Sequence, residues 1–217
     1  MKRIFAVLMI LVLSLSLFAC GDKDTKNAEP GFYENNEKFQ IGEIKGDTYE
    51  NKFFGIKCEI DNGWTFSTKE EIAELNNFTM DYLPEDLVEH YENSTHFIDM
   101  VASRRENSFE NINIFAIKMS KSEIESFDAK KSFEDSLPSV KETLENMGCT
   151  NCEFDIIKTT VDGVEYDAYR CTAQLETLSL YQEQIAVIRN GYLVTITVTT
   201  YDVDTCSDVF GFVTIEK

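Results

Sequence analysis

Hydrophobic and polar residues alternate most regularly in the last third of the chain. Between residues 192 and 198, apolar side chains take every second position and two threonines stand among the positions between them. This alternation predicts a β-strand with one face toward a core and one polar or lightly covered face. The dipeptide Asn190-Gly191 comes directly before this strand. It favours a type I′ hairpin turn that places Arg189 opposite Tyr192.

A second dipeptide of this kind, Asp162-Gly163, predicts another tight turn, with Val161 opposite Val164. Together the two turns predict four successive antiparallel strands within residues 153–200. Upstream, runs of apolar and branched residues predict three more strands. These are expected at Phe53–Ile60, Thr95–Ser103 and Ile112–Met119.

Capping residues and helical spacing predict helices between these strands. The first is expected at Lys69–Asn77, with Ser67 or Thr68 as its N-cap. A capping box at residues 122–125 predicts the start of a second helix. A short last helix is expected around residues 204–210.

A third helix is predicted in front of Gly148, which fits a left-handed helix stop. Its apolar residues recur at helical spacing: Leu137, Val140, Leu144 and Met147. Pro138 is expected in its first turn, where proline is tolerated. Antiparallel strands with helices between them indicate an α+β fold, an antiparallel β-sheet with helices packed on it.

The N-terminus has the features of an export signal. Lys2 and Arg3 form a short basic region, and the apolar run from Ile4 to Leu17 is short for a membrane span. The sequence Leu17-Phe18-Ala19-Cys20 resembles the lipobox of bacterial lipoproteins. The resemblance implies that residues 1–19 are a removed signal peptide and that Cys20 carries lipid. We therefore expect a lipid-anchored protein on the extracytoplasmic face of the cell membrane.

The mature chain is strongly acidic. Residues 1–19 contain two basic residues and no acidic one, so 18 basic residues remain against 39 acidic ones, a net charge of −21. Such a surface repels nucleic acid and anionic headgroups, so nucleic acid is not expected as a partner and the acyl chains must provide the membrane attachment. Residues 20–48 are polar and sparse in apolar residues, which predicts a lipidated N-terminus and tether, with one domain at 49–217.

The start of this domain resembles PsbP-like domains, whose fold is also called Mog–PsbP-like. The resemblance rests on residues 49–56, Tyr-Glu-Asn-Lys-Phe-Phe-Gly-Ile, and on Gly63-Trp64 followed by a helix. Asp61 departs from the family, which usually has proline there. The resemblance implies an α/β/α sandwich over residues 49–217 and binding without catalysis. Trp64 is expected to be a core residue at the corner.

Five cysteines besides Cys20 lie in the expected domain. Cys149 and Cys152 form a C-x-x-C pair, which suggests thiol–disulfide redox activity as an alternative function. The pair follows a predicted helix end, however, where the helix dipole disfavours a thiolate. An exported location favours a structural disulfide instead, with four candidate cysteines. These are Cys149, Cys152, Cys171 and Cys206, and Cys58 is expected to be a free buried thiol.

The sequence alone does not determine how these four cysteines pair. The register of the Asp162-Gly163 hairpin places Cys171 opposite Phe154 and diagonal to Cys152, which is somewhat far for a bridge. The C-x-x-C pair could instead reach Cys206.

The sequence contains no motif for a hydrolase, a phosphate loop or a zinc site, so no cofactor, metal or catalytic residue is expected. The leading hypothesis is therefore a non-enzymatic binding or assembly module for an envelope protein or an apolar ligand. The aromatic-rich segment Phe78–Phe97 is the candidate binding surface, and ordinary core packing is the alternative for it. The residues singled out in this segment are Tyr82, Leu83, Leu87 and Tyr91.

Overall fold

The structure is a computed structural model that describes residues 38–76 and 84–216, without the side chains of residues 84–87. Within these residues, two antiparallel sheets form. The larger has seven strands, in the order β4 (Trp64–Phe66), β5 (His96–Arg104), β6 (Asn111–Lys118), β10 (Tyr192–Tyr201), β9 (Leu178–Arg189), β8 (Val164–Leu175) and β7 (Cys149–Val161). The smaller has four, in the order β1 (Glu43–Lys45), β2 (Thr48–Asn51), β3 (Ile56–Glu59) and β11 (Val213–Ile215).

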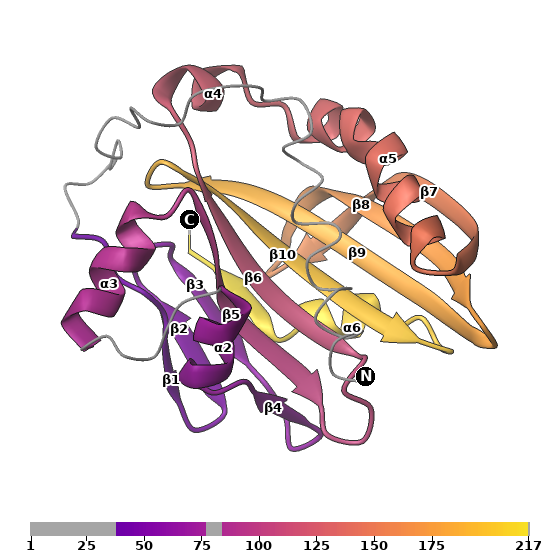
Figure 1. Ribbon diagram of the computed structural model, residues 1–217, viewed down its shortest axis with the longest axis horizontal. Coiled ribbons are helices and arrows are strands. Elements are labelled where there is room, and N and C mark those ends of the chain that lie inside the picture. The colour runs from indigo at the N-terminus through magenta and orange to yellow at the C-terminus, as the bar shows by residue number, and fades with distance from the viewer. Residues whose placement is uncertain (1–37, 77–83, 217) are drawn as a thin grey trace.

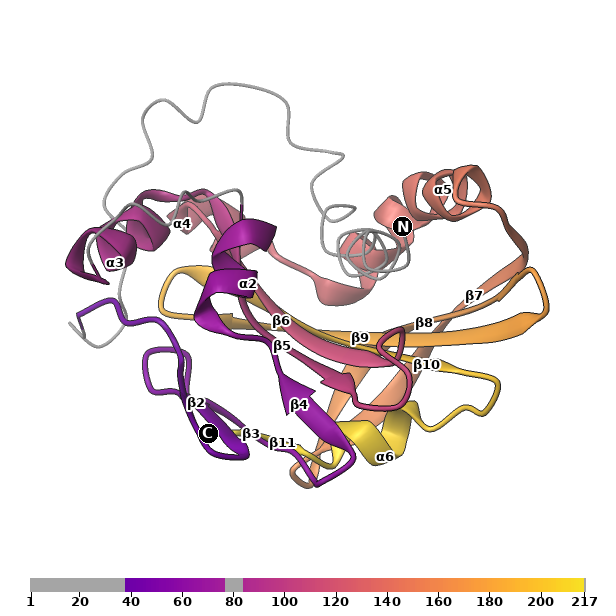
Figure 2. The same cartoon turned by 60° about the horizontal axis from the view of Figure 1, so that its bottom comes forward.

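The helices are divided between the two faces of the large sheet (Figures 1 and 2). One face carries α2 (Lys69–Leu75), α3 (Pro84–Asn93), α4 (Lys121–Ser126) and α5 (Ala129–Asn146). The other face carries the small sheet and α6 (Cys206–Phe210). The predicted α+β fold, an antiparallel sheet with helices packed on it, is confirmed. Among the described residues, no helix is both long and apolar enough to cross a bilayer.

Both predicted hairpins have the expected register. Arg189 pairs with Tyr192 across Asn190-Gly191, and Val161 pairs with Val164 across Asp162-Gly163. Asn190 and Asp162 have φ values of 46° and 49°, the left-handed conformation that a type I′ turn requires. The four strands from β7 to β10 are therefore correctly predicted, although β7 begins at Cys149 rather than Glu153.

Helix starts differ from the expectation in two places. Helix α4 is capped by Ser120 and Glu123, two residues before the capping box expected at 122–125, because the same serine–glutamate spacing occurs there. Helix α5 begins after Asp128, so Pro138 lies inside the helix and not in its first turn. Pro138 and Glu134 are both exposed, and water can therefore bond the Glu134 carbonyl that proline leaves unpaired. The N-cap expected for α2, Thr68, is present.

The fold also includes residues upstream of Tyr49, where the domain was expected to start. Phe39 is 2% exposed, and its ring lies 5.2–5.9 Å from those of Phe53, Phe97 and Tyr192. Residues 43–45 form β1, which pairs with β2. These residues join the fold because an apolar side chain enters the main core and because β2 needs a pairing partner.

Trp64, expected to be a core residue, is 1% exposed and packs edge-on against Phe212. Strand β11 was not expected from the sequence. Together with α6, β11 shows that the chain's last residues close the lower layer of the molecule (Figure 2).

Candidate functional site

The helix-bearing face of the large sheet changes from apolar to polar at its centre. Seven polar residues lie side by side there, on three neighbouring strands, and we call them the amide–threonine seam. They are Asn111 and Asn113 of β6, Thr195, Thr197 and Thr199 of β10, and Gln182 and Gln184 of β9. All seven are at most 1% exposed. They form a polar strip in a face that is otherwise apolar.

Strand register explains how the amide–threonine seam forms. Thr197 pairs with Asn113 on one side and with Gln184 on the other, and Thr199 pairs likewise with Asn111 and Gln182. Residues directly opposite one another in antiparallel strands point to the same face. The threonine face of β10, expected from its alternation to be polar or lightly covered, is thus continued by amides on both neighbours. It is buried rather than solvated.

Two apolar clusters border the amide–threonine seam. At one end α2 packs on β5, over a cluster that includes Ile72, Val101 and Phe115. At the other end α5 packs on β7 and β8, over a cluster that includes Leu144 and Tyr169. Figure 2 shows the two helices standing apart above the sheet. The buried polar strip is therefore bordered by an apolar cluster on each side.

Hydrogen bonds within the amide–threonine seam satisfy part of its polar groups. The amide groups of Gln182 and Gln184 donate to the hydroxyls of Thr199 and Thr197, each at 2.8 Å. The Asn113 amide donates to Asn111 Oδ1 at 3.3 Å. These contacts hold the side chains in a row and fix the direction of each amide.

Three buried oxygens at the amide–threonine seam have no hydrogen-bond partner among the described residues. They are Oδ1 of Asn113 and the hydroxyls of Tyr169 and Tyr201. Tyr201 follows Thr199 on the same side of β10, and Tyr169 pairs with Gln184 from β8. Burial raises the pKa of both phenols, so both keep their proton and can donate it. Buried polar atoms are rarely left unpaired, so each of these three oxygens calls for an explanation.

The cysteines are divided between the two faces of the sheet. Cys149, Cys152 and Cys171 lie in the apolar cluster under α5, and Cys171 pairs with Phe154 as expected. Cys206 lies in the core on the opposite face, where its thiol contacts the Thr200 hydroxyl at 3.6 Å. The structure thus brings three of the four candidate disulfide cysteines together and leaves Cys206 apart. All are free thiols here, as is buried Cys58, and the disulfide stays a prediction.

The environment of the C-x-x-C pair opposes redox catalysis. Burial raises the pKa of Cys149 to about 11, and it also raises the pKa of Cys152. Cys171 is buried beside them, and its pKa is raised by burial and by the two neighbouring thiols. A redox-active cysteine needs a lowered pKa, because the thiolate is the nucleophile. None of these three residues has the required environment.

The aromatic segment expected to be a binding surface is described only in part. Tyr82, Leu83 and the side chain of Leu87 lie outside the described residues. Tyr91 is 3% exposed, and its ring packs edge-on against Phe97 at 5.0 Å. Tyr91 therefore contributes to the core and to no surface.

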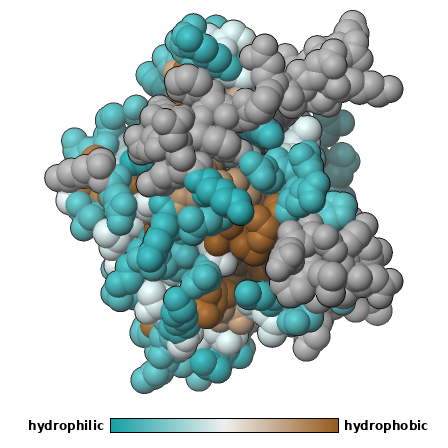
Figure 3. All heavy atoms as spheres, turned by 90° about the vertical axis from the view of Figure 1, so that its left-hand side faces the viewer, coloured by the Kyte–Doolittle hydropathy of each residue, from teal (hydrophilic) through white to brown (hydrophobic). Residues whose placement is uncertain are grey.

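A small cavity lies beside Tyr91, lined also by Ile41, Ile44, Ile72 and Asp99. Its volume of about 30 Å³ admits water but no larger molecule. On the side of the molecule that carries α3 and the small sheet, Figure 3 shows mostly hydrophilic residues around a small group of hydrophobic ones. The cavity beside Tyr91 is therefore too small to hold a ligand.

A buried carboxylate that the sequence analysis did not single out fastens the two sheets together. Asp99 on β5 accepts hydrogen bonds from the Tyr49 hydroxyl, from Asn51 Nδ2 at 2.7 Å and from the Gly42 backbone at 3.1 Å. Burial is the main influence on its pKa, which is raised, and the three hydrogen bonds counteract it in part. All three donors belong to the N-terminal segment or to β2. Asp99 therefore links both of these to β5 of the large sheet.

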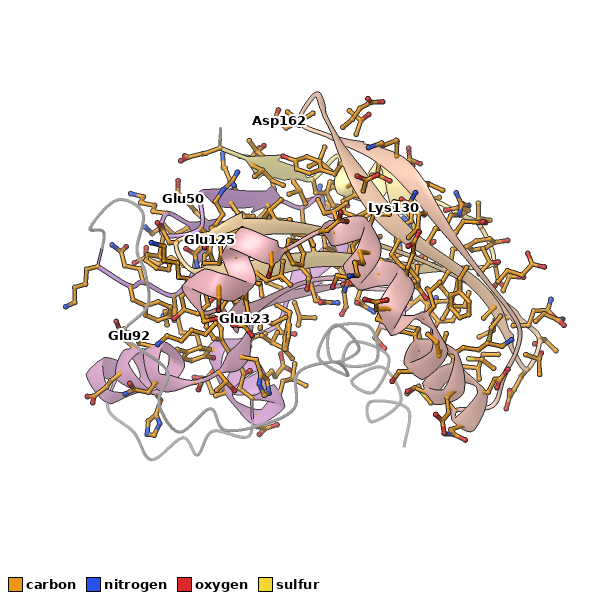
Figure 4. The ribbon with its side chains drawn as sticks, turned by 90° about the horizontal axis from the view of Figure 1, so that it is seen from above. Glu50, Glu92, Glu123, Glu125, Lys130 and Asp162 are labelled. Carbon is orange, nitrogen blue, oxygen red and sulfur yellow. The ribbon has the colours of Figure 1, made fainter. Side chains whose placement is uncertain are left out.

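Acidic residues are spread over several elements of the surface. Those labelled in Figure 4, Glu50, Glu92, Glu123, Glu125 and Asp162, lie on separate parts of the surface apart from the pair on α4. In the described part of the chain, no group of three or more histidine, cysteine or acidic residues has an arrangement that could hold a metal ion.

The chain matches no protein-family model and no curated protein. Among solved structures it is similar to cyanobacterial PsbP (CyanoP) from Synechocystis sp. PCC 6803. The two are 14% identical, the match covers 81% of this chain and 98% of that one, and the TM-score is 0.49.

Two further structures are more distant. LpqN, involved in cell envelope biogenesis of Mycobacterium tuberculosis, is 10% identical, with 75% of this chain and 83% of that chain covered and a TM-score of 0.37. A protein of Bacteroides thetaiotaomicron is 9% identical, with 80% and 50% covered and a TM-score of 0.39. At this distance we transfer no activity from these proteins, because one fold serves many functions.

Proposed function

We propose that this chain is a non-enzymatic binding module of the cell envelope, held at the membrane by lipid on Cys20, with its ligand on the amide–threonine seam. The observation that carries the proposal is the carbonyl oxygen of Asn113. It is fully buried, lies on β6 at the side of the seam that borders the apolar cluster of Val101, and has no partner among the described residues. Such an oxygen is stabilised when a ligand donates a hydrogen bond to it.

The chemistry of the amide–threonine seam indicates what the ligand is. The seam contains only amides and hydroxyls and no charged side chain, so it suits an uncharged ligand. Side-chain amides donate and accept, as the peptide group does. The clusters beside Val101 and Leu144 offer apolar surface on either side. An extended segment of an envelope protein fits this combination, because its main chain is amidic and its side chains can be apolar.

Site-specific photo-crosslinking in intact cells tests the site. A photoreactive residue in place of Ser103, which is half-buried on β5 opposite Asn111, should give one discrete adduct with an envelope protein. The same residue in place of Glu165, exposed near the tip of the β7–β8 hairpin, is the control and should not give that adduct.

The decisive variant is Asn113→Leu, which removes the unpaired Oδ1, together with the Nδ2 that donates to Asn111, and puts an apolar side chain of similar size in their place. It should keep the fold and reduce the adduct from Ser103 at least tenfold, since a buried donor on the ligand would lose its acceptor. An undiminished adduct in the folded variant would show that the partner does not use the seam. An equal adduct from the Glu165 position would show nonspecific contact.

The anchor is tested separately. With Cys20→Ser, incorporation of radiolabelled palmitate should be lost and the protein should leave the membrane fraction. Labelling that persists would place the lipid elsewhere. This result does not depend on the seam.

A further inference from the structure

A second hollow lies at the far end of the large sheet, on the face opposite to the amide–threonine seam. It has a volume of about 260 Å³ and spans β7, β8 and β9. We call it the polar groove. Its polar lining consists of Asn151, Glu153, Thr172, Gln174, Ser179 and Tyr181.

Register places the polar groove on the face that also carries α6. Thr172 pairs with Glu153 on β7 and with Tyr181 on β9, so these three side chains point the same way. Their neighbours Cys171 and Leu180 point to the other face, into the cluster under α5. The polar groove and the amide–threonine seam are therefore separated by the thickness of the sheet.

The backbone around the polar groove is unusual. The pairing of β7 with β8 is interrupted between Thr150 and Glu153, and Asn151 in this bulge has a φ of 52°. Glu176, in the turn from β8 to β9, has a φ of 56°, and Asp202 has a φ of 61°. The Asp202 backbone N–H donates to the Ser179 carbonyl at 2.8 Å. Non-glycine residues in this conformation are uncommon, and bulges bend a strand, so the hollow is a defined feature of the backbone.

The lining selects for a neutral, hydroxyl-rich ligand. Two carboxamides and one carboxylate can each bond two neighbouring hydroxyl groups, and the half-buried ring of Tyr181 adds an apolar face. No lysine or arginine lines the groove. Arg170, two residues from Thr172, is bound to Glu183 and Asp204 and is not available for an anion. The Glu153 carboxylate repels anions.

We propose that the polar groove binds one unit of a neutral saccharide. The volume of 260 Å³ lies just below the roughly 300–1,000 Å³ of sites for drug-sized molecules, which suits a single ring. The groove is open to solvent along its exposed residues Asn151, Glu153 and Gln174, so a longer glycan can continue beyond it. This inference stands independently of the proposed seam ligand.

Amide chemical-shift mapping of the full protein with N-acetylglucosamine, glucose and glucuronate tests the proposal. The two neutral sugars should shift the amide signals of residues 151–153, 172–174 and 179–181, with weak affinity. Glucuronate should bind at least tenfold more weakly than glucose, because its carboxylate meets Glu153.

Two exposed side chains give matched variants that should not disturb folding. Glu153→Gln should weaken the binding of neutral sugars about tenfold, as expected for a lost charge-assisted hydrogen bond. It should also reduce the difference in affinity between glucose and glucuronate. Glu165→Gln, on β8 and away from the groove, should change neither the affinity for neutral sugars nor the difference between glucose and glucuronate. Shifts on β6 and β10 instead, no shifts with either neutral sugar, or glucuronate binding as well as glucose would each overturn the proposal. The absence of a photo-crosslink at the amide–threonine seam would not affect the proposal of a saccharide site in the polar groove.

Discussion

Two tyrosine hydroxyls in this protein should respond in opposite ways to the same substitution. Tyr201 and Tyr49 are both buried, at 4% and 0% exposure. The Tyr201 hydroxyl has no partner among the described residues, whereas the Tyr49 hydroxyl donates to the buried carboxylate of Asp99. Replacing tyrosine with phenylalanine removes one oxygen and leaves the ring in place. Tyr201→Phe should therefore stabilise the protein, and Tyr49→Phe should destabilise it.

The size of each effect follows from what the oxygen does in the folded state. A buried hydroxyl without a hydrogen bond costs about 1–3 kcal/mol, so Tyr201→Phe should recover about 1–2 kcal/mol. Its ring packing on Phe109, at 6.0 Å, is preserved. A hydrogen bond to a charged group contributes about 1.5–3 kcal/mol, and Tyr49→Phe should lose this amount. The two variants should thus differ by about 2.5–5 kcal/mol in free energy of unfolding.

Urea denaturation of the purified protein measures both effects. The midpoint should rise for Tyr201→Phe and fall for Tyr49→Phe, with an unchanged slope in each case. In thermal unfolding, each kcal/mol corresponds to about 2–4 °C for a domain of this size. Tyr169→Phe, whose hydroxyl is also unpartnered, serves as a second stabilising case. If Tyr201→Phe and Tyr169→Phe destabilise the protein as much as Tyr49→Phe does, the hydroxyls have partners and the argument for a ligand at the seam fails.

Two further measurements test the titratable groups. Because burial raises the pKa of Cys149 to about 11, alkylation of Cys149 after mild reduction should be slow near pH 8 and should reach half of its full rate only near pH 11, as followed by peptide mass spectrometry. A rate like that of a free thiol at neutral pH would contradict the burial. The raised pKa of Asp99 means that the folded state favours its protonated form, so the stability that Asp99 contributes is present at low pH and is lost as the pH rises through the raised pKa. The stability of the wild type relative to Asp99→Asn should therefore decrease as the pH rises above about 4, the ordinary pKa of an aspartate. An increase would mean that the hydrogen bonds from Tyr49, Asn51 and Gly42 outweigh burial.

The parts of the fold that the sequence predicts well depend on local chemistry. Asn190-Gly191 and Asp162-Gly163 require positive φ, and each determines the register of two long strands without help from the rest of the chain. Strand β11 has only three residues and pairs with β3, more than 150 residues earlier. Its pairing depends on tertiary contacts that no local pattern reports. Local sequence was also misleading for helix α5. Pro138 suggested that the helix begins near it, whereas the helix begins at Ala129, after its N-cap Asp128.

The amide–threonine seam was visible in the sequence only as separate fragments. The threonines of β10 alternate, and Asn111 and Asn113, like Gln182 and Gln184, have the two-residue spacing of one strand face. Nothing local indicates that β6 and β9 lie on either side of β10, because β6 is some 75 residues away in the chain. Asp99 offered a clearer signal, as a single acidic residue between Phe97-Ile98 and Met100-Val101. An acid within a buried strand needs hydrogen-bond donors, and one of the three, the Gly42 backbone, came from a segment assigned to the tether.

The burial of Phe39 determines how the domain is held by its anchor. With lipid on Cys20 as proposed, residues 20–37 can extend at most about 65 Å, which limits how far from the bilayer the domain can work. A force applied through residues 20–37 acts on the domain first at Phe39 and at the Gly42–Asp99 hydrogen bond. The load therefore falls on the central aromatic core before it reaches the short edge strand β1, whose few contacts make it the weaker element. If Cys20 carries the lipid as proposed, the domain should resist unfolding by a force applied through its N-terminal segment.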